Sequence, residues 1–210
     1  MSVQSKPLRL FVASSNQGKL REYRALASAA NAPIELSPIP DFDAVPPYEE
    51  GTSTFAENAA GKAMYYSRFS PGLLLADDSG LVVPALGGAP GVHSARYAGP
   101  DASDADRIRK LLHELRGKTG EERRARFVCV LVLAEAGEAR AVFSASAEGE
   151  LLEAPQGQHG FGYDPIFFFP ALRKSYAELS IEEKNLYSHR GKAFRKALEF
   201  LLGEPRDGSD

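Results

Sequence analysis

The segment that most constrains the fold is the run FVCVLVLA at residues 127–134, which contains no charged side chain. An unbroken apolar run of this length is typical of a strand buried on both faces, so other elements must cover both of its sides. A turn centred on Gly137 follows, and residues 141–147 then alternate, with Ser144 and Ser146 on one face and Phe143 and Ala145 on the other. This pattern predicts an antiparallel partner strand and hence a long hairpin within an α/β fold.

Length, charge and cysteine content limit the classes of function. The 210 residues suffice for one core without repeats, so we expect a single domain over 1–210, with two lobes and flexible tails at 1–6 and 203–210. A net charge of −3 provides no global basic field for nucleic acid. The single cysteine, Cys129, excludes a disulfide scaffold and a cysteine-based zinc site. Because there is no signal peptide and no apolar run of about 20 residues, we expect a cytoplasmic protein that binds no membrane.

Two adjacent acids, Asp77 and Asp78, follow the apolar run that starts at Leu73 and precede Ser79-Gly80. The pattern predicts a strand that ends at the acids and opens into a glycine turn. Burying both carboxylates is costly, because like charges repel and each loses water, so a divalent cation or a metal-bound phosphate is a fitting partner. Alternatively, the acids are exposed turn residues, since Asp-Ser-Gly is common in turns.

A loop at residues 14–19, SSNQGK, separates a predicted strand at 8–13 from a helix with an apolar stripe at Leu20, Tyr23 and Ala27. The stripe places residues 21, 22 and 24, including Glu22, on the solvent face of the helix. Free N–H groups at the helix start, together with Lys19, suit a phosphate. The alternative is an ordinary capped turn with a solvated lysine.

A second acidic pair, Glu49-Glu50, precedes a helix predicted over 55–69, whose Thr54 and Glu57 have capping-box spacing. These glutamates could share a cation with Asp78, or they could simply complement the helix dipole. Asn58 and Lys62 lie one turn apart, so both could face one ligand or both could face water.

Glycines at 157, 160 and 162 surround Phe161 and Tyr163, whose flat rings suit a nucleobase or fill the core. Asp164 could contact such a ligand or orient the loop. A final helix is predicted from Ser180 to Leu201, interrupted by Gly191. Lys184, His189 and Arg190 on this helix indicate either a polar pocket or a solvated basic face. By contrast, the helix expected at 104–115 shows only the pattern of plain packing.

Five segments in this order resemble the motifs of the Ham1/inosine triphosphatase family of non-standard purine nucleoside triphosphate pyrophosphatases. They are SSNQGKLRE at 14–22, EEGTSTFAENAAGKA at 49–63, ADDSGLVVPALGGAPGVHSARYAG at 76–99, GFGYDPIFF at 160–168 and ELSIEEKNLYSHRGKA at 178–193. The resemblance spans nearly the whole chain. It implies an α/β fold with a single elongated mixed β-sheet flanked by helices, in two lobes with the active-site cleft between them.

The resemblance also implies roles for individual residues. Asp78 matches the family's proton acceptor and magnesium ligand, and Asp77 its supporting neighbour. Glu49 matches the second metal ligand, with Glu50 as the alternative, because this chain has Glu-Glu-Gly-Thr where the family commonly has Glu-Glu-Thr-Gly. The positions that match substrate contacts are Ser14, Asn16, Lys19, Ser79, Phe161, Gly162, Tyr163, Asp164, Lys184, His189 and Arg190.

By this resemblance the chain is expected to be a Mg²⁺-dependent homodimeric enzyme. It would hydrolyse ITP, dITP and XTP between the α- and β-phosphates and release the monophosphate and pyrophosphate. Two alternatives stay open: a Maf-type pyrophosphatase that acts on other modified nucleotides, and a nucleotide-binding module without catalytic activity. Intact Asp77, Asp78 and Lys19 argue against the module.

Overall fold

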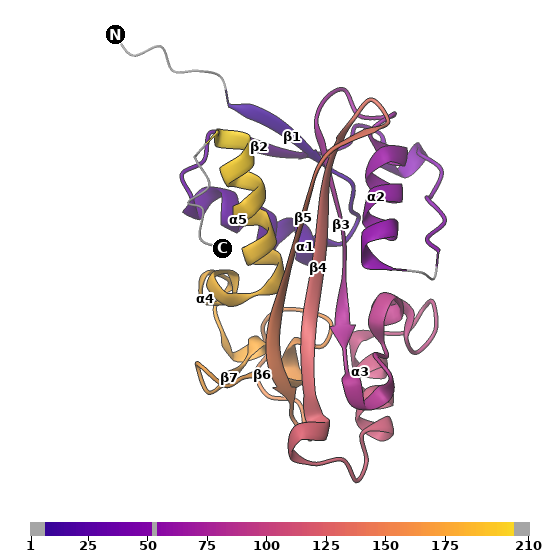
Figure 1. The fold of residues 1–210 in the computed structure, drawn as a ribbon, viewed down its shortest axis with the longest axis vertical. Helices are drawn as coiled ribbons and strands as arrows, with labels where there is room; N and C mark the ends of the chain where they lie inside the picture. Colours follow the sequence, from indigo (N-terminus) through magenta and orange to yellow (C-terminus); the bar gives the residue numbers. More distant parts are fainter. Residues whose placement is uncertain (1–6, 52–53, 204–210) are drawn as a thin grey trace.

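The computed structural model describes residues 7–51 and 54–203. The tails expected at 1–6 and 203–210 therefore lie outside the described residues, except for Gly203. Within these ranges the chain forms one seven-stranded mixed sheet in the order β2-β1-β3-β4-β5-β6-β7 (Figure 1). Its strands are β1 (Leu8–Val12), β2 (Ile34–Pro38), β3 (Leu74–Val82), β4 (Arg124–Glu135), β5 (Glu138–Leu151), β6 (Phe167–Phe169) and β7 (Lys174–Ser175). β1 pairs in parallel with β2 and β3, and the later pairs are antiparallel. The predicted α/β fold with a mixed sheet is confirmed.

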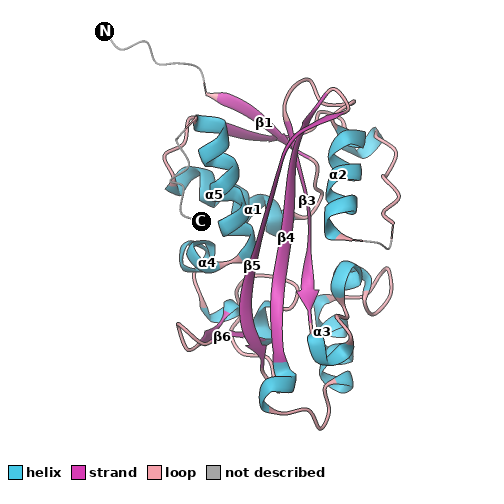
Figure 2. Ribbon diagram, in the orientation of Figure 1, coloured by secondary structure: helices cyan, strands magenta, loops and turns pink. Residues whose placement is uncertain are grey.

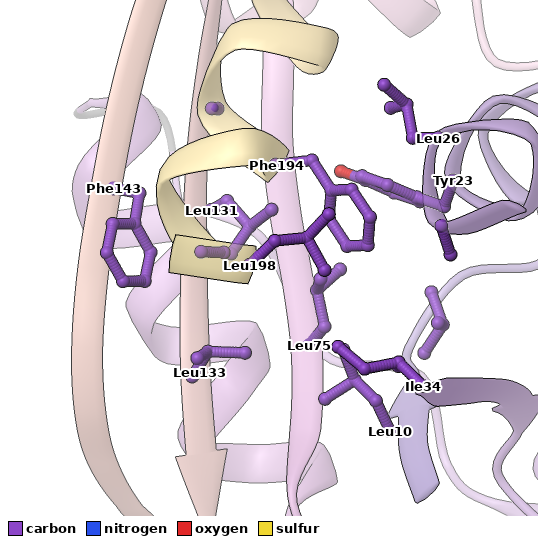
Figure 3. Close-up of a cluster of buried hydrophobic side chains, with 14 of the residues drawn as sticks. Leu10, Tyr23, Leu26, Ile34, Leu75, Leu131, Leu133, Phe143, Phe194 and Leu198 are labelled. Carbon is purple, nitrogen blue, oxygen red and sulfur yellow. The ribbon is translucent and has the colours of Figure 1, made fainter. Parts of the chain in front are cut away.

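Helices cover both faces of the sheet (Figure 2). α1 (Gln17–Ala29) and α5 (His189–Leu202) pack on one face, and α2 (Phe55–Tyr66) packs on the other. Side chains of β4 alternate between these cores: Leu131 and Leu133 join the α1–α5 core shown in Figure 3, whereas Val130 and Val132 lie beneath α2. β4 is therefore buried on both faces, as its apolar run predicts.

A third hydrophobic cluster fills the lower part of Figure 1. It joins α3 (Asp104–Glu114) to β6 through residues such as Ile108, Leu111 and Phe167. The β4–β5 hairpin extends from the part that contains α1, α2 and α5 into the part that contains α3 and β6. The molecule therefore has two lobes on one sheet. In the described part of the chain, no helix is both long enough and apolar enough to cross a membrane.

Each helix begins at a polar residue whose side-chain oxygen accepts a backbone N–H, which satisfies a group that the helix leaves unpaired. These caps are Asn16, Thr54, Ser103, Ser180 and, for α5, Ser188. The predicted continuous C-terminal helix is wrong: it is α4 (Ile181–Tyr187) followed by α5. The break occurs because Ser188 is extended, with ψ 154°, and caps α5 by accepting a hydrogen bond from Gly191 N at 3.0 Å. The helix expected to reach residue 69 ends at Tyr66.

The acid pair lies inside a strand, so the expectation of a strand end at Asp78 is wrong. β3 continues to Val82, with Asp77 opposite Leu131 and Asp78 opposite Val130 in β4. Gly80 explains why the strand can continue there. A Cβ at Gly80 would lie 2.5 Å from the carbonyl oxygen of Gly91, so only glycine lets the neighbouring segment pack so closely.

Candidate active site

A cleft of about 610 Å³ opens where the two lobes meet. Its walls include the β1–α1 loop, the middle of β3, and the segments around residues 42–50, 92–95 and 161–164. Residues of the helices α2, α3, α4 and α5 complete the lining. The lining includes all of the predicted substrate-binding residues and both acids: Ser14, Asn16, Lys19, Asp77, Asp78, Ser79, Phe161, Gly162, Tyr163, Asp164, Lys184, His189 and Arg190. Motifs that are far apart in the sequence therefore meet in one cleft.

The β1–α1 loop presents the start of α1 to the cleft. Asn16 Oδ1 accepts a hydrogen bond from Lys19 N at 3.1 Å, and Ser14 Oγ accepts one from Asn16 N at 3.2 Å. This geometry leaves helix N–H groups and the Lys19 ammonium near the same space, which suits an anion. Lys19 Nζ lies 2.8 Å from Asp77 Oδ2, so the lysine connects this loop to the acid pair.

The two acids of β3 occupy different environments, because adjacent side chains of a strand point to opposite faces. Asp77 is buried and faces Lys19 and Arg190. Burial raises its pKa, but the charges of Lys19 and Arg190 outweigh burial and lower the pKa to about 2. Asp78 faces α2, and its pKa is raised above the usual value, because burial outweighs the attraction of Lys62. Asp78 is thus the better proton acceptor of the pair.

Lys62 on α2 bridges Asp78 to Glu50. Its Nζ lies 2.9 Å from Asp78 Oδ1 and 2.8 Å from Glu50 Oε1, while Asn58 Nδ2 donates to Asp78 Oδ2 at 3.3 Å. Burial raises the pKa of Glu50, but Lys62 and the Arg96 guanidinium, 2.9 Å away, bring it below its usual value. Asn58 and Lys62 do therefore face one site, as their spacing allows.

The predicted metal ligand Glu49 is exposed and does not line the cleft, whereas its neighbour Glu50 does. Glu50 is therefore the glutamate that the structure brings toward Asp78, through Lys62. Among the described residues, no group of three or more His, Cys, Asp or Glu side chains is arranged to hold a metal.

A network of buried charges lies beside the acids. Glu22 of α1 contacts both Lys184, at 2.6 Å, and Arg190, and Lys184 in turn contacts Asp164. Burial raises the pKa of Glu22, but its two cationic partners lower it overall. The prediction that Glu22 faces solvent is wrong, because its side of α1 meets α4 and α5. Arg21 and Arg24 are exposed, as predicted. The network leaves no charge in it without an opposite partner, as burial requires.

His189 is buried and stacks on Phe127, with ring centroids 4.7 Å apart. Burial and the positive charges of Arg190 and Lys184 lower its pKa well below the usual value, so the imidazole is neutral. A neutral imidazole has one donor and one acceptor nitrogen, and it can therefore sense the hydrogen-bonding pattern of a ligand.

The loop at residues 160–164, here called the aromatic loop, carries two rings that lie in different surroundings. Tyr163 is buried in the lower core and donates from its hydroxyl to the Ser94 carbonyl at 3.0 Å, so it acts as a core residue. Phe161 is half-buried at the cleft, with Lys184 Nζ 5.0 Å from its ring centroid. Asp164 orients the loop by accepting a hydrogen bond from Phe161 N at 2.8 Å.

Comparison with known proteins identifies the family. The Ham1 family model matches residues 10–200. The chain belongs to the Ham1 family. A relative from Geobacillus kaustophilus, named dITP/XTP pyrophosphatase, is 51% identical over 190 residues, which cover 90% of this chain and 92% of the relative. A protein of the same name from Thermus thermophilus is 48% identical over 200 residues, 94% of each chain.

Solved structures of Ham1 proteins share the fold. The HAM1 protein from Coxiella burnetii superposes with a TM-score of 0.82 at 41% identity, over 93% of this chain and 99% of that one. The Ham1 protein from Staphylococcus aureus gives a TM-score of 0.80 at 40% identity, over 94% of this chain and all of the other. The resemblance that the sequence motifs predict is confirmed over almost the full length.

Four residues received no role from the sequence patterns. Asp104 and Arg107 line the Ham1 cleft. Glu22 and Arg96 do not line it but pair with Lys184 and Glu50, which do. Glu22 carries the helical spacing of a solvent residue, and Arg96, Asp104 and Arg107 occur in segments read as loop or packing. The available signal for Glu22 was its place within the SSNQGKLRE motif. For Arg107 and Asp104 the only signal was that their charges stand at the start of a helix that follows a glycine-rich segment.

Proposed function

We propose that this Ham1-family protein hydrolyses ITP, dITP and XTP between the α- and β-phosphates and releases the nucleoside monophosphate and pyrophosphate. The observation that carries the proposal is the meeting of Lys19, Asp78 and Arg190 in one cleft. One end of this cleft suits a polyphosphate, its centre holds a proton acceptor, and its far end has buried donors. The name dITP/XTP pyrophosphatase, shared by several relatives, supports the same reaction.

In this reaction the loop from Ser14 to Lys19 holds the triphosphate through helix N–H groups and the Lys19 ammonium. Asp78 takes the proton from the attacking water, and its raised pKa favours this role. Asp77 stays charged and keeps Lys19 in position. General base catalysis of this kind contributes roughly 10²–10⁴-fold to a rate.

Recognition of the base falls to Lys184, His189 and Arg190, with Ser79 and the loop from Phe161 to Asp164. Arg190 Nη2 donates to Ser79 Oγ at 2.8 Å, while Glu22 fixes both cations from behind. The 6-oxo group of a purine would accept hydrogen bonds from these protein donors. The 6-amino group of adenine is itself a donor and would face them unpaired. Buried polar groups left unpaired can discriminate by about 10⁴–10⁵-fold.

The cofactor that we propose is Mg²⁺. Carboxylate oxygens are the ligands this ion prefers, and Asp78 and Glu50 present such oxygens within reach of one ammonium group, so the donor set fits a small hard cation. We assign the second ligand to Glu50, with Glu49 as the alternative. When bound, Mg²⁺ would neutralise charge on the triphosphate and on the leaving pyrophosphate.

Family resemblance also supports a cytoplasmic homodimer as the working form of the protein. Size-exclusion chromatography with light scattering would test the dimer directly. A mass equal to one chain at micromolar concentration would contradict it.

The deciding assay uses purified protein, Mg²⁺ and a panel of ITP, XTP, dITP, GTP, ATP and dTTP, with pyrophosphate and orthophosphate measured separately. We expect pyrophosphate from ITP, XTP and dITP and little from ATP and dTTP. The Asp78→Asn variant should release at least about 10²-fold less from ITP. Orthophosphate as the sole product would refute the proposal. Preference for dTTP would point to a Maf-type enzyme, and binding of ITP without turnover by the wild-type protein would point to a binding module.

A further inference from the structure

One wall of the cleft contains a contact between a helix and a loop that are distant in the sequence. Asp104 is the first residue of α3, and its Oδ2 accepts a hydrogen bond from Gly162 N at 2.7 Å. Both residues line the cleft. The helix that the sequence assigns to plain packing thus contributes a carboxylate that holds the aromatic loop.

The same carboxylate is anchored on its other side. Asp104 Oδ1 pairs with Arg107, one turn further along α3, and Arg107 donates to the carbonyl of Ala95. The loop is also held by the hydroxyl of Tyr163, which donates to the carbonyl of the adjacent Ser94 at 3.0 Å. Two separate connections therefore join the aromatic loop to one short segment, the 3-10 helix Gly91–Arg96.

The geometry of Gly162 makes its amide available for this bond. Gly162 has φ +64°, a left-handed conformation that glycine adopts without strain, and a side chain added there would meet nothing within 4 Å. The requirement for glycine is thus set by backbone conformation rather than by crowding. Removing the acceptor would leave the N–H of Gly162 without its protein partner.

The position of Gly162 matters because its neighbour Phe161 lines the cleft and reaches α1. The Phe161 ring lies so close to the first turn of α1 that a Cβ at Gly18 would be 2.5 Å from Phe161 Cδ1. The loop therefore places one ring between the base-binding end and the start of the phosphate loop. A small displacement of Gly162 would move this ring.

We infer that Asp104 is a positioning residue that holds residues 160–163 in the conformation that receives the purine base. The inference rests on the proposed function and extends it to a residue outside the family motifs quoted above. It predicts that loss of Asp104 weakens contacts with the base and spares contacts with the phosphates. Asp104 bonds to Gly162 and Arg107, whereas the phosphate loop and the acid pair are joined by bonds of their own.

The test compares Asp104→Ala with Asp104→Asn, whose amide oxygen can still accept the bond from Gly162 N. We expect Asp104→Ala to raise KM for ITP about tenfold while kcat changes less than about threefold, as loss of ground-state positioning does. Inhibition by IMP, which carries the base, should weaken in parallel, whereas inhibition by pyrophosphate should stay the same. Asp104→Asn should recover most of the loss.

Two control variants isolate the loop contact. Asp101→Asn removes one negative charge from an exposed position just before α3. Asp106→Ala removes the side chain that accepts hydrogen bonds from Ser103 N and Oγ at 3.0 and 2.6 Å, so it loosens the helix start without touching the loop. Both variants should keep the wild-type KM for ITP and the wild-type affinity for IMP.

The inference fails if Asp104→Ala leaves KM and IMP affinity unchanged, or if it weakens pyrophosphate binding as much as IMP binding. It also fails if Asp106→Ala has the same effect as Asp104→Ala. Calorimetric titration of IMP and pyrophosphate provides the same comparison without turnover. A wild-type protein that does not hydrolyse ITP would therefore refute the proposed function, while these titrations would still decide the role of Asp104.

Discussion

Replacing Asp77 by asparagine should destabilise the fold, whereas the same change at Asp78 should stop turnover. The pKa of Asp77 is about 2, against an ordinary value of 3.8. Since one pKa unit corresponds to about 1.4 kcal/mol, the folded protein favours the charged form of Asp77 by about 2–3 kcal/mol. Asparagine resembles the uncharged acid and leaves Lys19 with a weaker partner, so we expect a loss of that size. For a chain of this length the loss lowers Tm by about 5–10 °C.

Asp78 should behave in the opposite way. Its pKa is raised, so the fold disfavours its charge, and an amide in its place should change Tm little. Turnover of ITP should nevertheless fall by at least about 10²-fold, because the proton acceptor is gone. Paired measurements of Tm and of pyrophosphate release on both variants separate the two roles.

The pH dependence supplies a further check on Asp77. A depressed pKa contributes stability that is present above the unfolded value of about 3.8 and is lost as pH falls toward about 2. The difference in stability between wild type and Asp77→Asn should therefore shrink across this window in urea unfolding. If Asp77→Asn is as stable as the wild type at neutral pH, or if Asp78→Asn is equally destabilised, the division of roles is refuted.

Three further predictions concern other residues of the fold and site. His189 is neutral in the folded protein and has an ordinary pKa when unfolded. The free energy of urea unfolding should therefore fall by up to about 1.4 kcal/mol per pH unit as the pH drops below about 6.5, and it should fall less steeply in His189→Asn. Glu50→Gln should weaken Mn²⁺ binding measured by electron paramagnetic resonance with ITP present, whereas the matched variant Glu49→Gln should not; the reverse order would assign the metal to Glu49. Burial raises the pKa of Cys129 to about 12, so a thiol reagent should modify it only at the rate of unfolding, and fast labelling of the native protein would contradict the structure.

The sequence was sufficient for features that depend on neighbouring residues. The run at 127–134 predicts a strand buried on both faces, and β4 is such a strand. Ser180 and Glu183 predict a capping box, and both of its hydrogen bonds are present. Such patterns are reliable because caps and periodicity act over a few residues, without help from distant parts of the chain.

Glu22 shows where such patterns fail. Helical periodicity separates apolar from polar faces, but a polar face can meet either water or other charges. In this protein, α4 and α5 cover Glu22 at the edge of that face with Lys184 and Arg190. Only the tertiary structure determines which surroundings Glu22 has, so local sequence could not place this carboxylate beneath the cleft. The contact between Asp104 and Gly162 is hidden for the same reason.

The acid pair shows how a wrongly predicted strand end changes the interpretation of two side chains. Two acids at a strand end would share one exposed turn and would need one cation between them. Inside a continuous strand they point to opposite faces, which reduces their repulsion and gives each its own cation, Lys19 for Asp77 and Lys62 for Asp78. The cations around Asp77 outweigh burial and lower its pKa, whereas burial outweighs Lys62 and raises the pKa of Asp78. The separate roles that we propose for the two acids therefore depend on the continuation of β3 through Gly80, whose missing side chain makes room for the neighbouring segment.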